Sequence, residues 1–477
     1  MNNNQFFNPY YQNDTIAAIS TPFGVGGIGI VRMSGPCSVS IASKVFRHKG
    51  KTKKKPREFS SHRLYYGTIV YPENEKLVDE VILSVMRRPK TYTKEDIVEI
   101  NCHGGLLVVN KVLEILIKNG ARLAEPGEFT KLAFLNGRID LSQAEAIIDI
   151  IQSNNDRNLN SSLYHLAGGL KEKISNLINT IVNLKVKIEA PMDFPDQGIE
   201  EIDITEIKGT LKKCNDEVKC LLDTFNYGQI IREGIRCIIL GKTNIGKSSL
   251  FNSLLKKNRA IVAPMEGTTR DILEENIYLN GYQFNLVDTA GMKDPENIVE
   301  QISLKKVNQS MGYAQILIVM FDASNPLDQQ DIVLIDKIKS FANRNKKIIV
   351  VENKIDLPVK MDSKLLYQKL GIKESIKISV KKKKGIELLE KKMIDAITSD
   401  ITIPEDGVVI IRKRHQECLI KVQEVLKNLL LSLDAGIQED FIAMDLKYII
   451  NQLGRITGKV NDEEILNQVF SKFCIGK

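Results

Sequence analysis

Tryptophan is absent from this chain of 477 residues, and aromatic residues make up only 6% of it. Its seven cysteines are scattered, odd in number and without a Cys-x-x-Cys pair, which argues against a disulfide framework and against a zinc site. No apolar run approaches the roughly 20 residues that a membrane helix needs. The first residues carry no basic segment followed by an apolar stretch, so we expect no targeting signal, a cytoplasmic location and no membrane partner.

The composition is that of a globular protein, 43% hydrophobic and 26% charged. A chain of this length exceeds one hydrophobic core, which predicts two or three domains. The net charge is +8, and lysines cluster between Lys51 and Lys55 and between Lys381 and Lys384. Solvated loops explain both clusters more simply than a nucleic-acid contact does, although the charge permits an RNA partner.

Hydrophobic periodicity divides the chain into parts. Residues 15–136 alternate short β-like runs with Gly and Pro turns, which indicates a small α+β domain. Helical spacing follows from Leu141 to Pro191 and from Ile207 to Phe225, and it returns from Gln416 to the end. Between these stretches strands alternate with helices, as in a mainly parallel α/β sheet. We predict a multidomain α/β and α fold, in which an α/β domain is inserted into a helical domain, with boundaries at 1–136, 137–228, 229–397 and 398–477.

Gly241 to Ser248 satisfy the P-loop pattern directly after an apolar strand. Glycines allow backbone N–H groups to wrap phosphates at a helix N-terminus. We expect Lys247 to reach the outer phosphates and the Ser248 hydroxyl to ligate Mg²⁺.

Two further motifs belong around the γ-phosphate. Asp288 to Gly291 follow a second apolar strand, where a P-loop nucleotide hydrolase places its metal-facing aspartate and its phosphate-sensing glycine. Thr269 lies in a Gly-Thr-Thr segment between the two motifs, and its hydroxyl is expected to complete the Mg²⁺ shell.

Guanine selectivity is predicted from Asn353, Lys354 and Asp356 at the end of an apolar strand. A carboxylate accepts two N–H bonds from guanine, whereas adenine lacks that donor pair. Ser379-Val380-Lys381, after a further apolar strand, fits the last base-contacting loop. Five motifs in order thus predict a GTPase with GTP contacts at Asn244, Ile245, Gly246, Lys247, Ser248, Ser249, Gly267, Thr268, Thr269, Asp288, Thr289, Ala290, Gly291, Asn353, Lys354, Asp356, Ser379, Val380 and Lys381.

The water-orienting group of this GTPase is not evident from its residues. Gly291 is followed by Met292, whose thioether cannot orient the attacking water. Glu300 is a candidate, although a solvated glutamate on a helix face explains it more simply. The Asn244 amide either coordinates a monovalent cation beside the phosphates or occupies a variable loop position. The residues alone leave both questions open.

At the level of the whole chain, the sequence resembles the family of tRNA uridine 5-carboxymethylaminomethyl modification GTPases, called MnmE or TrmE. Besides the nucleotide motifs, the likeness is carried by Asp14-Thr15-Ile16, Gly26 to Arg32, Asn101 to Gly105, Pro126 to Thr130, Asp193-Phe194-Pro195 and the terminal Phe473-Cys474-Ile475-Gly476-Lys477.

The resemblance implies an N-terminal domain that dimerises and binds a reduced folate, 5-formyl- or methylene-tetrahydrofolate, through Arg32, Glu99, Arg138 and Lys477. It implies a potassium ion held by Asn244, Ala263, Met265 and Thr268, and further GTP contacts at Ala263, Pro264, Met265 and Glu266. It also assigns water orientation to Glu300.

The resemblance also implies partners. Members form a heterotetramer with an FAD-dependent protein, MnmG, and modify carbon 5 of the wobble uridine of certain tRNAs. The Cys474 thiol is a candidate nucleophile toward a uridine ring, although a packing role explains it more simply. A ribosome-assembly or signalling GTPase is the alternative function, and it offers no use for the terminal Cys-Ile-Gly-Lys.

Overall fold

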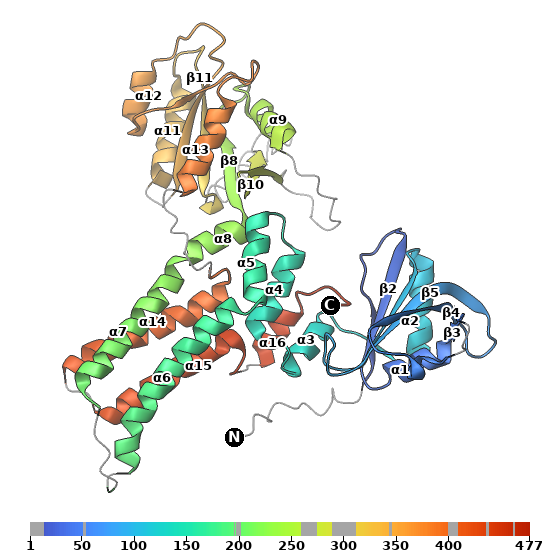
Figure 1. The fold of residues 1–477 in the computed structure, drawn as a ribbon. Coiled ribbons are helices and arrows are strands. Elements are labelled where there is room, and N and C mark those ends of the chain that lie inside the picture. The colour runs from blue at the N-terminus through green and yellow to red at the C-terminus, as the bar shows by residue number, and fades with distance from the viewer. Residues whose placement is uncertain are drawn as a thin grey trace, which may run out of the picture. The chain divides into compact units, whose positions relative to one another are not determined.

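A computed structural model describes residues 14–50, 54–194, 196, 202–258, 274–288, 312–342, 346–398, 409–435, 438–460 and 463–477. Two compact units divide the chain. The first, here the outer unit, comprises residues 1–151, 165–207 and 432–477, and the second, the central unit, comprises residues 152–164 and 208–431. Figure 1 shows a sheet with helices in each of two parts of the chain and long helices besides. No described helix has the length and apolarity needed to cross a membrane.

The outer unit contains a seven-stranded sheet in the order β3-β4-β5-β6-β2-β1-β7. All neighbouring strands are antiparallel except β1 and β7. The strands are β1 (Ile16–Ile19), β2 (Ile28–Ser34), β3 (Phe46–His48), β4 (Arg63–Val70), β5 (Leu77–Met86), β6 (Ile97–His103) and β7 (Arg122–Leu123).

Helices α1 (Ser38–Val45) and α2 (Leu106–Lys118) cover one face of this sheet. Alternate strand residues such as Val31 and Met33 of β2 point into the core that both helices share. On the other face, Ile16 and Ala18 pack with Phe129 and Leu132 of α3 (Glu128–Leu135). The polar residues between the apolar ones of β2 are therefore directed to this second face.

The remaining helices of the outer unit come from two separate stretches of the chain: α4 and α6 from the first, and α15 and α16 from the second. Helix α6 packs along α15, and α16 joins α3 and α4 in one apolar cluster that contains Phe470 and Phe473. Their bounds are α4 (Leu141–Ile151), α6 (Gly169–Asp193), α15 (Glu439–Thr457) and α16 (Glu463–Phe470).

The predicted continuous helical stretch over 141–191 is divided into α4, α5 (Asp156–Leu166) and α6. The break between α4 and α5 ends at Asn155. Its side-chain oxygen accepts a hydrogen bond from the backbone N–H of Asn158 at 2.8 Å and thereby caps the start of α5. Gly168, with φ at 101°, precedes α6. Hydrophobic periodicity alone did not reveal these two breaks, because the helical spacing of apolar residues continues across them.

The central unit contains a six-stranded sheet in the order β13-β12-β11-β8-β10-β9. It is parallel except for the β9–β10 hairpin. The strands are β8 (Ile235–Leu240), β9 (Glu274–Leu279), β10 (Tyr282–Asp288), β11 (Ile316–Asp322), β12 (Lys347–Asn353) and β13 (Ile376–Lys377).

Helices cover both faces of the second sheet. Cys237 and Ile239 of β8 face a core with α9 and α13, whereas Ile238 and Leu240 face a core with α11 and α12. This burial on both sides explains the unbroken apolar strands. The described helices that lie wholly or mainly in the central unit, besides α5, are α7 (Ile204–Asp223), α8 (Phe225–Glu233), α9 (Lys247–Asn258), α11 (Gln329–Ala342), α12 (Ser363–Leu370), α13 (Ile386–Thr398) and α14 (Lys413–Asp434). The predicted multidomain α/β and α fold class is confirmed.

Candidate functional site

The predicted phosphate loop lies between β8 and α9, so its residues form a strand, a loop and a helix N-terminus in succession. Lys247 begins α9 and is 8% exposed, and its Nζ donates to the carbonyl oxygens of Gly241 at 2.9 Å and Lys242 at 2.7 Å. Ser248 and Ser249 follow in the first turn and are exposed. This arrangement presents backbone N–H groups, an ammonium group and hydroxyls at one helix end, which suits phosphates with Mg²⁺.

Lys242 fixes the start of this loop to the neighbouring helix. Its Nζ lies 2.7 Å from Asp328 Oδ2 and 2.6 Å from Asp331 Oδ2, at the beginning of α11. Partial burial would lower the pKa of Lys242, but the hydrogen bonds that it donates to both aspartates outweigh this effect and raise the pKa. The ammonium group therefore stays charged and anchors the loop.

The base-reading residues lie together at the ends of β12 and β13. Ser379 Oγ donates to Asp356 Oδ1 at 2.6 Å, and the backbone N–H of Val380 donates to Asn353 Oδ1 at 3.2 Å. The bond from Ser379 lowers the pKa of Asp356. Asp356 is thus held as a charged acceptor, as its predicted contact with the guanine N–H groups requires.

Asn353 also connects the base-reading residues to the phosphate loop. Its Nδ2 donates to Ile245 O at 2.8 Å. Gly246 has φ at 104°, and a Cβ there would lie 2.6 Å from Asn353 Nδ2. Only glycine satisfies both the left-handed backbone and this close approach. Lys354, at the next position, forms an ion pair with Asp322 at 2.7 Å.

A cavity of about 870 Å³ joins the two halves of the nucleotide site. The predicted residues Asn244, Gly246, Ser249, Asn353, Lys354, Asp356, Val380 and Lys381 line it. Sequence reasoning missed a further set on α9 and at the start of α13, which carries no nucleotide motif: Asn252, Ser253, Lys256, Lys257, Ile386 and Glu387.

Several predicted nucleotide and cation contacts lie outside the described residues. These are Ala263, Pro264, Met265, Glu266, Gly267, Thr268, Thr269, Thr289, Ala290, Gly291 and Glu300. The strand β10 ends at Asp288. Of the predicted potassium ligands, Asn244 is described. It is exposed and has φ at 62°, a left-handed conformation that asparagine tolerates better than most residues do.

The predicted folate contacts Arg32 and Arg138 lie beside the Tyr92 ring, and Glu99 is paired with Arg32. Arg32 of β2 lies opposite Glu99 of β6, and its Nε is 2.7 Å from Glu99 Oε1. The guanidinium of Arg32 lies 5.9 Å from the centre of the Tyr92 ring, and that of Arg138 lies 4.7 Å from it. Burial raises the pKa of Tyr92. The two cations and the carboxylate can bind a ligand that carries both acidic groups and N–H donors.

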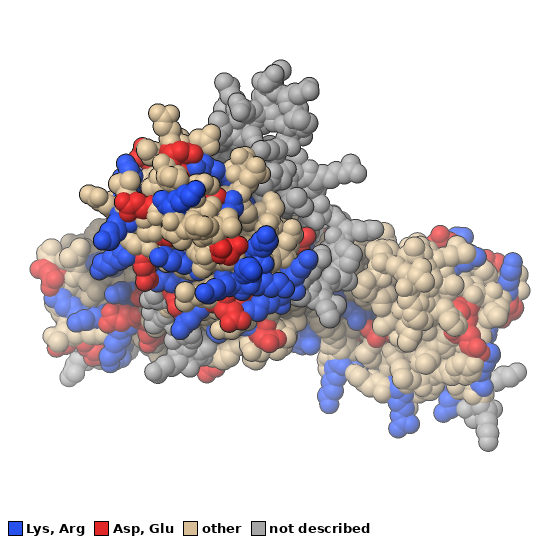
Figure 2. Space-filling view, turned by 90° about the horizontal axis from the view of Figure 1, so that it is seen from above, with Lys and Arg blue, Asp and Glu red and all other residues tan. Residues whose placement is uncertain are grey.

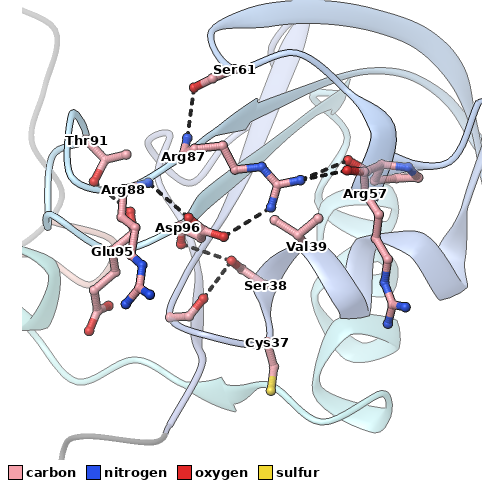
Figure 3. A network of polar contacts seen from close by, with 12 residues as sticks. Cys37, Ser38, Val39, Arg57, Ser61, Arg87, Arg88, Thr91, Glu95 and Asp96 are labelled. Atoms are coloured by element: carbon pink, nitrogen blue, oxygen red, sulfur yellow. Dashed lines mark hydrogen bonds and ion pairs between the residues drawn. The ribbon is translucent and has the colours of Figure 1, made fainter.

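Tyr92 lies on the loop between β5 and β6. Polar contacts hold this loop in place, and Figure 3 shows those around Asp96. Asp96 accepts from the Arg87 guanidinium at 3.1 Å and from the backbone N–H of Arg88 at 2.9 Å. Thr91 Oγ1 donates to Glu95 O at 2.6 Å. These bonds close the loop at its base. The folate prediction contained no signal for Tyr92, because it is an aromatic residue without a motif.

The C-terminal segment reaches the same sheet. Ser20 Oγ, just after β1, donates to Gly476 O at 3.2 Å, and a Cβ on Gly476 would lie 2.2 Å from Ile19 O. Ser20 also bonds through its N–H to Ile30 O, two residues before Arg32. Lys477 is therefore placed at the sheet that carries Arg32 and Glu99. Cys474 is exposed.

A phosphate loop at the ends of parallel strands, joined through Asn353 to a base-reading carboxylate, defines a guanine-nucleotide-binding protein of the P-loop class. Two family models match the chain: the MnmE helical domain over residues 141–474 and the N-terminus of the GTP-binding protein TrmE over residues 15–138. The chain therefore belongs to the MnmE family of tRNA modification GTPases.

Curated relatives support the same assignment over nearly the full length. The tRNA modification GTPase MnmE of Thermoanaerobacter pseudethanolicus is 45% identical over 97% of this chain and 99% of its own. That of Carboxydothermus hydrogenoformans is 43% identical over 97% and 99%. That of Enterococcus faecalis is 40% identical over 97% and 98%. The predicted family is thus confirmed.

Proposed function

We propose that this GTPase is potassium-dependent and acts with the FAD-dependent partner MnmG on tRNA. It would modify carbon 5 of the wobble uridine to an aminomethyl or carboxymethylaminomethyl group. The observation that supports the proposal most is full-length similarity to tRNA modification GTPases in a chain that carries two separate binding clusters. One cluster suits GTP, and the other, around Tyr92, suits a reduced folate as the one-carbon source.

The residues present fit the groups that this function requires. Ser248 at the start of α9 would ligate Mg²⁺, which neutralises phosphate charge, and the Asn244 amide would hold K⁺ beside the phosphates. Arg32, Glu99, Arg138 and Lys477 would bind and orient the folate. Homodimerisation and the domain boundaries at 136, 228 and 397 belong to the same proposal.

Reconstitution tests this function directly. Unmodified tRNA is incubated with the chain, the FAD-dependent partner, GTP, Mg²⁺, K⁺, a reduced folate and either glycine or ammonium, and the nucleosides are then analysed by mass spectrometry. We expect the mass of the wobble uridine to rise only in the complete mixture. A mixture without folate, GTP or this chain is the control. An unmodified uridine in the complete mixture, with GTP hydrolysed normally, would refute the tRNA assignment.

A further inference from the structure

Four consecutive lysines, Lys381 to Lys384, form the turn between β13 and α13, here called the lysine turn. Ser379 and Lys384 close it by exchanging two backbone hydrogen bonds, each 3.0 Å long. The backbone N–H of Lys382 donates to Ser379 Oγ at 3.1 Å, and Lys383 adopts φ at 54°. The backbone of the turn is thus fixed by its own bonds, while all four side chains are exposed.

The lysine turn lacks the acidic partners that other lysines of this unit have. Lys257 pairs with Glu387 and Glu390, and Lys392 pairs with Glu374. Within the part of the chain that the structure describes, no side chain of the lysine turn forms an ion pair. Like charges this close in sequence repel one another, so a polyanion that neutralised them would be favoured.

The positive charge continues beyond the turn along one cavity. Lys256 of α9 and Lys381 and Lys383 of the lysine turn line the same 870 Å³ cavity, which extends past Asp356 to the end of α9. In Figure 2, which is seen from above, many basic side chains gather on one face with scattered acidic ones among them. The nucleotide site is thus bordered by a basic surface that its own chemistry does not require.

We infer that the lysine turn, together with Lys256, binds the phosphate backbone of an RNA. An RNA backbone carries a regular row of negative charges, which suits a row of ammonium groups that form no ion pair within the described part of the chain. Lysines act as point charges and lack the planar fork with which arginine reads a guanine edge, so they contact phosphates rather than bases. The surface therefore contributes affinity that is independent of sequence and sensitive to salt.

This inference rests on the proposed function, which identifies the bound RNA as tRNA. The same turn also carries Ser379 and Val380, which bond to Asp356 and Asn353. The lysine turn is therefore continuous along the backbone with two residues that hydrogen-bond to the predicted base-reading residues. Any change that tRNA makes to GDP affinity must be matched by an equal effect of GDP on tRNA affinity.

The test compares two triple variants of the full chain. The first is Lys382→Gln, Lys383→Gln and Lys384→Gln, which leaves Lys381 and the nucleotide contacts intact. The matched control is Lys360→Gln, Lys364→Gln and Lys373→Gln, three exposed lysines of the same sheet domain away from the cavity. Both remove three positive charges. Binding of labelled total tRNA is measured by fluorescence anisotropy over a KCl series, and binding of a fluorescent GDP analogue confirms that each variant is folded.

We expect the turn variant to bind tRNA roughly tenfold or more weakly near physiological salt, with a salt slope smaller by about 2 to 3, since each lost phosphate contact removes roughly 0.7–0.9. The control should retain the slope and affinity of the unaltered chain. Equal losses in both variants, or an unchanged turn variant, would overturn the inference and leave the proposed function standing. Absence of tRNA binding by the unaltered chain in any salt would overturn both. Binding of labelled polyglutamate is measured in the same way. A turn variant that loses polyglutamate binding but keeps tRNA binding would overturn the inference and indicate an acidic protein partner.

Discussion

Asp356 can select guanine only while its carboxylate is charged and correctly oriented. The Ser379 hydrogen bond keeps the pKa of Asp356 below its ordinary value of 3.8. Because this pKa is lowered, the Asp356 carboxylate is fully charged at pH values well above 3.8. The charge is lost only as the pH falls through the lowered pKa. Asp356 should therefore cause no change in guanine-nucleotide affinity between about pH 8 and pH 5.

Replacing Asp356 by asparagine should reverse one of its two bonds to the base. The amide can donate to the second oxygen of xanthine but cannot accept both guanine N–H groups. We expect GTP affinity to fall at least about a hundredfold while xanthosine triphosphate gains affinity. Competition against a fluorescent nucleotide measures both. Asp336→Asn, an exposed site on α11, is the control. Unchanged GTP affinity in Asp356→Asn would remove the base-reading role.

A second prediction at the scale of single residues concerns Arg32 and Glu99. Each should bond to folate through a charged group, so Arg32→Ala or Glu99→Ala should weaken folate binding roughly tenfold or more in calorimetry. Arg47→Ala breaks a different ion pair, with Glu75, in the same sheet and should leave folate binding unchanged. If both pocket variants bind folate like the unaltered chain, the pocket lies elsewhere.

At the scale of elements, the strongest sequence signals were strands buried on both faces. The apolar strand predicted before the P-loop appears as β8, and the one predicted before Asn353 appears as β12, because continuous apolar runs suit a covered parallel sheet. The β9–β10 hairpin was not predicted. Its turn, Asn280-Gly281, has positive φ at both residues and is a strong hairpin signal that could have revealed it.

The folate cluster shows what local patterns omit. Arg32, Tyr92 and Arg138 come from distant parts of the chain and meet only through the pairing of β2 with β6 and the loop that precedes β6. The resemblance supplied Arg32 and Arg138, but no spacing rule connects them. The phosphate loop, by contrast, was predictable because its residues are contiguous.

Docking of the C-terminal segment against α3 depends on Gly127. Its φ is 71°, and a Cβ there would lie 2.7 Å from Phe470 O and 2.9 Å from Phe473 Cβ. Gly127→Ala should therefore lower the free energy of unfolding by roughly 1–3 kcal/mol through overpacking, in addition to the backbone strain. Gly120→Ala isolates that strain, because Gly120 also has positive φ but nothing within 4 Å. Urea unfolding midpoints that fall equally in both variants would contradict the contact.

At the scale of the whole molecule, the potassium hypothesis predicts how turnover depends on concentration and on the cation. If potassium orders the loop that contains Ala263 to Thr268 and thereby forms the contact between two nucleotide domains, hydrolysis per molecule should rise with protein concentration. Sodium at constant ionic strength should slow hydrolysis, by up to roughly 10³–10⁵ if the ion replaces an arginine finger. GDP binding should hardly change.

Glu300→Ala separates water orientation from nucleotide binding. We expect this variant to bind GTP normally and to lose hydrolysis, as measured by phosphate release against nucleotide titration. Equal turnover in sodium and potassium, together with an active Glu300→Ala variant, would contradict the cation mechanism and leave a GTPase that hydrolyses by other means.

The division of the chain into its two units has a consequence for how the protein is made. The outer unit is assembled from three stretches, and residues 432–477 lie in the last of them, with α15 packed along α6 and α16 packed with α3 and α4. A ribosome that has reached residue 431 has already produced every strand of the central sheet. The seven strands of the outer sheet, residues 16–123, are produced earlier still, so both sheets precede the helices α15 and α16. Folding during synthesis is therefore ordered: the sheets can form first, while the helices of the outer unit wait for distant contacts that close slowly. A chain cut short near its end would retain a nucleotide site and lack Lys477.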